Sequence, residues 1–247
     1  MKKKAVIVLF LLVVFGLFYL CIYTNALIDV LYKEKIWVHR TNSVEKLHAV
    51  KDKFYGVELD IEYLDSLNIF DVNHPPAKSI GLTLDTYFFE ASMNNTLHYW
   101  LDFKNLNEVN VEKSSALLER ICVKNHINPS HIIVESNNVR LLEEFQHKGY
   151  QVSYYLNWPG LYTLDSIGLK NELELIKHNL KNIDFPCNLS VDYHDYDILK
   201  HNFPNYNLLL WLDDNFDESI RNRFLLFVML NDNNVKVILF KFKSHER

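Results

Sequence analysis

From residue 35 onward, short apolar runs alternate with longer amphipathic stretches. The apolar runs predict strands at 35–39, 55–61, 69–73, 98–103, 131–135, 150–156, 188–192, 206–212 and 235–242. The amphipathic stretches predict helices at 43–52, 83–93, 109–126, 137–148, 167–181, 194–202 and 216–230. Repeated alternation of this kind favours an α/β fold with a parallel sheet covered by helices. Because the run 69–73 follows its predecessor too closely for a crossover helix, eight strands remain, as in a (β/α)₈ TIM barrel.

Composition narrows the class of protein further. The chain has 247 residues, of which 49% are hydrophobic, so residues 27–247 can form one domain around one core. The net charge of −5 is spread without a basic block, which argues against a nucleic-acid partner. Cys122 and Cys187 lack the spacing of a zinc site, and a disulfide between them stays open.

The first 26 residues differ from the rest of the chain. Residues 5–23 carry no charge and are long enough to cross a bilayer as a transmembrane helix, a signal-anchor. With Lys2, Lys3 and Lys4 before this segment, the domain would lie outside the cytoplasm. The alternative is a cleaved signal peptide with Thr24 and Ala26 at its cleavage site, which would make the protein secreted.

Two carboxylates mark the strand at 55–61. Glu58 and Asp60 are two residues apart, so both side chains point to the same face of an extended strand. Like charges held close raise each other's pKa unless a cation neutralises them. Oxygen ligands suit a hard divalent cation, Mg²⁺ or Ca²⁺.

Further polar residues stand at the ends of neighbouring strands. In a TIM barrel the carboxyl ends of the strands form one mouth. We therefore expect seven side chains to converge there: His39, Arg40, Glu58, Asp60, His74, Asp102 and Lys104. Carboxylates suit a metal, the cations suit an anionic substrate, and histidines exchange protons near neutral pH. The structural alternative is that the acids only pair with Arg40 and Lys104.

This pattern resembles the glycerophosphodiester phosphodiesterase superfamily, whose fold is an irregular TIM barrel. The shared motifs are His39-Arg40, Glu58-x-Asp60, a strand ending in His74, and an acid-x-Lys strand end at Asp102. The runs 73–77 and 100–106, NHPPA and WLDFKNL, are most similar to the menorin branch of that superfamily.

The resemblance implies a role for each matching residue. His39 and His74 correspond to acid/base catalysts, and Glu58, Asp60 and Asp102 to metal-binding acids. Arg40 and Lys104 correspond to phosphate-contacting cations. Asn42 and Trp211, near strand ends, are further substrate-binding candidates, although Asn42 is equally a helix cap and Trp211 equally a core residue.

The implied reaction is metal-assisted hydrolysis of a phosphodiester, either a small molecule or one derived from a lipid. Three departures from the superfamily pattern bear on it: the segment 41–43 replaces a glycine and a longer loop, Pro75 replaces an acid after His74, and Asp102 replaces a glutamate. The alternative function is a non-catalytic, menorin-like surface module that binds a protein or a glycan.

Other polar and aromatic residues have structural interpretations. We expect Tyr154 and Tyr155 in the core, Asn137 at a helix cap and Glu62 in solvent beyond the barrel rim. Asp192 and His194 resemble an Asp/His pair, but no nucleophile lies nearby in sequence. None of the nine histidines other than His39 and His74 shows ligand spacing.

Overall fold

A computed structural model describes residues 2–23, 28, 30–91, 96–156, 159–213, 216 and 219–242, with the side chains of residues 6–16 in the N-terminal helix. Within these residues, eight parallel strands close into a barrel in the order β1-β9-β8-β7-β6-β5-β4-β2, and β2 pairs with β1. The barrel strands are β1 (Ile36–Val38), β2 (Gly56–Leu64), β4 (His98–Phe103), β5 (Ile132–Ser136), β6 (Gln151–Tyr155), β7 (Asn188–Asp192), β8 (Leu208–Trp211) and β9 (Val235–Phe240). The predicted α/β barrel is confirmed.

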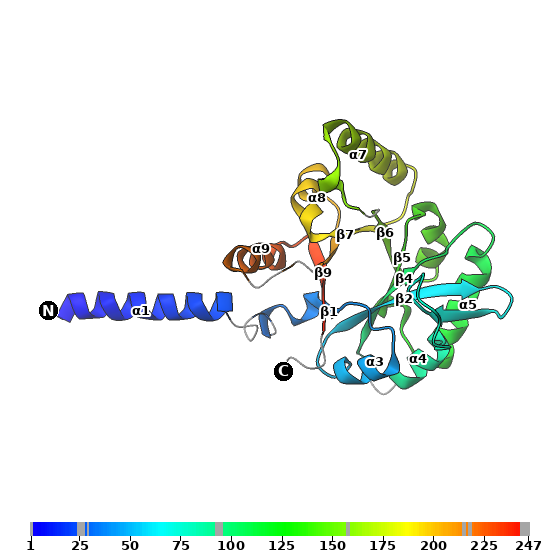
Figure 1. Ribbon diagram of the computed structural model, residues 1–247, viewed down its shortest axis with the longest axis horizontal. Coiled ribbons are helices and arrows are strands. Elements are labelled where there is room, and N and C mark those ends of the chain that lie inside the picture. The colour runs from blue at the N-terminus through cyan, green and yellow to red at the C-terminus, as the bar shows by residue number, and fades with distance from the viewer. Residues whose placement is uncertain are drawn as a thin grey trace.

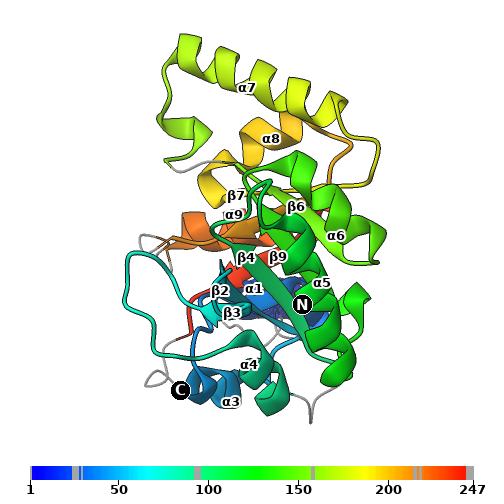
Figure 2. The ribbon, with the colours of Figure 1, turned by 90° about the vertical axis from the view of Figure 1, so that its right-hand side faces the viewer.

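The predicted strand at 69–73 lies beside the barrel. β3 (Ile69–Val72) pairs antiparallel with β2, and its short connection to β2 leaves no space for a crossover helix. Helices connect the barrel strands in the described part of the chain: α3 (Val44–Val50), α4 (Leu84–Ala91), α5 (Val111–Lys124), α6 (Glu143–His147), α7 (Ser166–Lys181), α8 (Tyr196–Asn202) and α9 (Ile220–Asn231). Figures 1 and 2 both show α7 and α8 on the side of the barrel opposite α3 and α4.

Side-chain alternation along the strands separates two cores. Outward residues pack under the helices, whereas the barrel interior is filled by Trp37, Trp100, Ile133, Leu209, Val237 and Leu239. Gly56 makes room for this filling, because a Cβ there would lie 2.3 Å from the Trp37 ring. Each inward row then continues to the carboxyl ends of the strands, where the next inward side chains form the mouth.

The helix α1 (Lys2–Tyr23) extends away from the barrel, as Figure 1 shows. Its described side chains, 6–16, are exposed. In the part of the chain that the structure describes, no helix has the length and apolarity needed to cross a membrane. The cleavage-site alternative at Thr24 and Ala26 lies outside the described residues. The described residues therefore do not support the predicted transmembrane helix, and the signal-peptide alternative stays a prediction.

Candidate active site

The three predicted metal-binding acids lie together at the barrel mouth. Glu58 and Asp60, both on β2, are 2% and 1% exposed. Asp102 on β4 is the direct register partner of Asp60. One ligand atom from each of the three carboxylates lies within 4.8 Å of the others. We call these three residues the acid cluster, and their convergence agrees with the expectation that Glu58 and Asp60 share a face.

The turn after β1 holds the two buried acids in place. The Arg40 N–H donates to Glu58 Oε2, and the Thr41 N–H donates to the Glu58 carbonyl oxygen at 2.7 Å. The Asn42 side chain donates to Asp60 Oδ2 at 2.6 Å and accepts from the Asp60 N–H at 2.9 Å. Asn42 thus positions Asp60 and is not among the residues that line the described cavity. Ser43 caps α3, because its side chain accepts from the Lys46 N–H.

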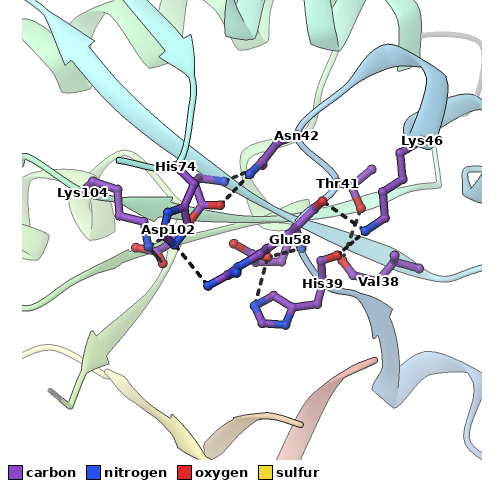
Figure 3. A network of polar contacts seen from close by, with 11 residues as sticks. Val38, His39, Thr41, Asn42, Lys46, Glu58, His74, Asp102 and Lys104 are labelled. Carbon is purple, nitrogen blue, oxygen red and sulfur yellow. Dashed lines mark hydrogen bonds and ion pairs between the residues drawn. The ribbon is translucent and has the colours of Figure 1, made fainter. Parts of the chain in front are cut away.

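Lys104 supplies a cation to the acid cluster. Its Nζ lies 2.8 Å from Asp60 Oδ1 and also donates to Asp102, as Figure 3 shows for the Asp102 contact. Burial alone would lower the pKa of Lys104, but Asp102 and Asp60 outweigh burial and raise it. The predicted pairing of Lys104 with the acids is therefore present in the structure.

The carboxylates still repel one another despite this lysine. Burial raises the pKa of Glu58 well above its ordinary value, and the charges of Asp60 and Asp102 raise it further. Burial likewise raises the pKa of Asp102, against the opposing effect of Lys104. Three carboxylates around one ammonium leave excess negative charge, which a divalent cation would neutralise. The oxygen-only donor set and its charge therefore fit Mg²⁺ or Ca²⁺.

The His39 ring lies beside Glu58 at the barrel mouth (Figure 3). Its Nε2 is 3.7 Å from Glu58 Oε2, and its side chain is 14% exposed. Burial, with a contribution from Arg40, lowers the pKa of His39 to about 3, so the ring is neutral near pH 7. Its buried Nδ1 has no hydrogen-bond partner among the described residues.

His74 reaches the mouth from the segment after β3. Its Nε2 is 3.1 Å from Arg40 Nη2 and 4.0 Å from Asp60 Oδ1. Because a guanidinium can only donate, Nε2 is the acceptor in this contact and carries no proton. His74 and Arg40 thus meet beside the acid cluster, as the sequence predicted.

A cavity of about 700 Å³ extends from these residues across the mouth. Trp211 lies on its wall and stacks with Tyr155, with ring centroids 5.5 Å apart. The expectation of a core position is confirmed for Tyr154 and wrong for Tyr155, because alternation turns Tyr155 inward.

Six further side chains line the cavity that the sequence did not predict to lie there: Glu62, Glu135, Asn137, Tyr155, Asp213 and Lys241. Glu62 accepts from the Asn73 side chain rather than leaving the rim. Asn137 lines the cavity instead of capping a helix, since a 3₁₀ turn over Val139–Leu142 precedes α6. Counting two residues on from Ile133 and from Trp211 along the inward rows leads to Glu135 and Asp213, so strand alternation predicts both positions.

Glu135 is the most buried of these missed acids, at 2% exposure. Burial raises its pKa well above the ordinary value, and Asp102 raises it further. Its Oε2 has no hydrogen-bond partner within the described residues.

Comparisons with known proteins place this geometry in context. Neither protein-family models nor curated proteins match the sequence. Among solved structures, a glycerophosphodiester phosphodiesterase from Parabacteroides distasonis is similar, with 17% identity, TM-score 0.57, and coverage of 84% of this chain and 92% of that one.

Two further structures agree with the first. A Thermotoga maritima glycerophosphodiester phosphodiesterase has 15% identity, TM-score 0.52, and coverage of 83% and 92%. An Oleispira antarctica phosphodiesterase bound to sn-glycerol-3-phosphate has 14% identity, TM-score 0.51, and the same coverage. At these identities the similarity concerns the fold. The chain thus has the TIM-barrel fold found in glycerophosphodiester phosphodiesterases.

Proposed function

We propose that the chain is a metal-dependent phosphodiester hydrolase of the glycerophosphodiester phosphodiesterase type. The observation that carries this proposal is the convergence of the acid cluster with two histidines, Arg40 and Lys104 on one cavity. A purely structural ion-pair network accounts for the lysine, but it does not account for two histidines at neighbouring strand ends.

Glu58, Asp60 and Asp102 would hold the divalent cation. When bound, that ion would stabilise negative charge that develops on the non-bridging phosphate oxygens. Lys104 lies against Asp60 and Asp102, so its ammonium is in place to contact the same oxygens once the acids are neutralised. The Arg40 side chain is exposed, and its planar guanidinium offers a pair of donors to the phosphate oxygens.

The histidines have different surroundings, which suggests different roles. His39 is neutral, so a ring nitrogen can accept a proton from the attacking water or hydroxyl. The neighbouring Glu58 carboxylate would stabilise the imidazolium formed in this step. His74 is more exposed, and phosphate binding to Arg40 would free its Nε2 to carry a proton to the leaving alcohol.

The substrate we propose is a glycerophosphodiester or a related phosphodiester derived from a lipid. The cavity continues beyond the cluster to the aromatic wall formed by Tyr155 and Trp211, leaving room for an alcohol on the phosphate. For the site of action we propose the extracytoplasmic side of a membrane, with a secreted form as the alternative. This location rests on the uncharged residues 5–23 and the lysines before them.

Calorimetric titration of Mg²⁺ and Ca²⁺ into the chain, combined with a hydrolysis assay on glycerophosphodiesters, tests the proposal. We expect saturable binding and hydrolysis in the parent, and loss of both in Glu58→Gln/Asp60→Asn. The exposed-acid variant Glu143→Gln serves as the control and should behave as the parent. A folded parent that hydrolyses no phosphodiester with either metal would refute the proposal.

A menorin-like, non-catalytic surface module is the second candidate. It is favoured by the internal pairing of the acids, since Lys104 and Asn42 together satisfy Asp60 without an ion. Such a module would bind its protein or glycan partner equally well after His39→Ala and His74→Ala, whereas a hydrolase would lose activity in both variants.

A further inference from the structure

A second cluster of metal-binding side chains lies on the opposite side of the barrel mouth. Asp192 ends β7, His194 follows it, and Asp213 comes just after β8. One ligand atom from each lies within 4.8 Å of the others. We call Asp192, His194 and Asp213 the imidazole cluster. β7 stands four strands from β2 in either direction around the barrel, so the imidazole cluster faces the acid cluster across the mouth.

Asp192 is the buried centre of the imidazole cluster. It is 1% exposed and continues the inward row of β7 after Ser190. Its Oδ1 accepts from the His194 N–H at 3.0 Å and lies 2.6 Å from the ring Nδ1. Its Oδ2 is buried and has no hydrogen-bond partner among the described residues. A buried carboxylate oxygen without a partner is uncommon, and it indicates an absent donor or cation.

The histidine of this cluster is held in a fixed orientation. The Tyr162 ring stacks on His194 with centroids 4.5 Å apart, and Tyr193 packs on it at 3.9 Å. Asp195 fixes the segment that carries Tyr162, because its carboxylate accepts from the N–H groups of Leu161 and Tyr162 at 2.8 and 2.7 Å. The imidazole is thus preorganised, and its 34% exposure leaves a path for an ion.

We propose that Asp192, His194 and Asp213 bind a divalent transition-metal ion, such as Zn²⁺ or Mn²⁺. Imidazole nitrogen together with carboxylate oxygen suits such ions, whereas the oxygen-only acid cluster suits Mg²⁺ or Ca²⁺. Bonds of about 2.1 Å separate two ligands of a tetrahedral ion by roughly 3.4 Å, so small side-chain shifts would complete the site. The ion would bind the unpaired Oδ2 of Asp192, and three protein ligands leave room for a water.

The position of Asp213 gives this site a relation to the substrate cavity. Asp213 lines the cavity next to Trp211, while Asp192 is the register partner of Trp211. A bound ion would therefore place positive charge at the far wall of the cavity. The proposed site contains no cysteine, so the lack of zinc-site spacing at Cys122 and Cys187 does not argue against it.

Co²⁺ titration of the full chain, followed by calorimetry and visible absorption, tests this site. The titration uses the Glu58→Gln/Asp60→Asn background, which lacks the acid cluster. We expect one Co²⁺ per chain with a nitrogen-ligand absorption band. His194→Gln on this background should weaken binding by about 10- to 100-fold or more and remove the band. Asp192→Asn should have the same effect.

The matched control is His147→Gln, which removes an exposed histidine of α6 and should leave Co²⁺ binding within about twofold of the background. If the background or Asp192→Asn does not fold, the test uses His194→Gln in the parent. The number of Co²⁺ ions bound per chain should then fall from two to one. Absence of Co²⁺ from the folded background overturns the proposal, as does equal binding by His194→Gln and His147→Gln.

Discussion

The acid cluster and the imidazole cluster occupy opposite walls of one barrel mouth, yet their buried carboxylates are stabilised differently. In the acid cluster, Lys104 and Asn42 contact the carboxyl groups directly. In the imidazole cluster, Asp192 has one oxygen bound by His194 and one without a partner among the described residues. The first cluster therefore has a counter-ion within the chain, whereas the second has a ring contact on one carboxylate oxygen of Asp192. We expect the two walls to respond differently to mutation.

The largest expected difference concerns the histidines. His39→Ala should reduce the rate of phosphodiester hydrolysis by about 100- to 10,000-fold, because it removes the proposed general base. Metal affinity at the acid cluster should change little, since His39 is not one of its ligands. Single-turnover kinetics combined with calorimetry would measure both quantities.

His194→Gln is the matched comparison on the other wall, and it should leave the intrinsic rate within about tenfold, below the range expected for a general base. If His194→Gln slows hydrolysis as much as His39→Ala, the assignment of proton transfer to one wall is wrong.

Removal of the internal counter-ion should have the next largest effect. Lys104→Met leaves Asp60 and Asp102 without their ammonium and should destabilise the metal-free protein by about 2 kcal/mol, between the values for exposed and buried pairs. Added Mg²⁺ should restore more stability to this variant than to the parent. Thermal unfolding with and without Mg²⁺ measures both effects.

The control for this change is Lys113→Met, which breaks an exposed pair with Asp65 and should not shift the unfolding temperature measurably. A Lys104→Met protein as stable as the parent without metal would show that the pair contributes nothing to the fold.

The aromatic wall should contribute a smaller effect. Trp211→Leu removes the partner of Tyr155 and should raise KM by about two- to tenfold at unchanged kcat, as expected for an aromatic contact. Steady-state kinetics with glycerophosphodiesters would measure the change. A fall in kcat alone would instead place Trp211 in the chemical step.

The smallest expected effect is a pH dependence carried by Glu135. Burial and Asp102 raise its pKa in the folded protein, so the folded state holds this proton more tightly than the unfolded chain. The resulting stabilisation is fully present below the ordinary value of 4.5 and is lost as the pH rises through the folded-state pKa. Glu135→Gln should therefore be more stable than the parent at neutral pH and similar to it below pH 4.5.

Denaturant unfolding across pH, in the presence of a chelator, measures this difference between variant and parent. Glu143→Gln changes an exposed glutamate of α6 and should show no such dependence. A constant stability difference between Glu135→Gln and the parent at every pH would argue against a raised pKa.

The barrel was predictable because each strand and each helix has its own periodic pattern. The acid cluster was also predictable in part, since Glu58 and Asp60 share a face in any extended strand. Whether Lys104 contacts Asp60 could not be predicted from the sequence, because the contact depends on the strand register that places Asp102 beside Asp60. Register between strands distant in sequence leaves no local signal.

The imidazole cluster shows the same limit. Asp192 and His194 are recognisable as a pair, but Asp213 joins them only through the neighbouring position of β7 and β8. The sequence predicts a helix cap or a substrate-binding residue at Asn42, whereas its contact with Asp60 follows from the turn that precedes it. Arg40 sets the path of that turn through its positive φ. Because Arg40 is not a glycine, the sequence does not indicate an unusual backbone conformation there.

Arg40 has a φ of +52°, a left-handed conformation that costs a residue with a side chain about 1–2 kcal/mol. The same residue carries the guanidinium that contacts His74. Selection for thermal stability alone would therefore favour glycine here, at the expense of the guanidinium. With the phosphate-binding role proposed for its guanidinium, Arg40 represents a trade-off between folding and function. In a directed-evolution experiment, drift to glycine at this position would report that the proposed hydrolysis was not under selection.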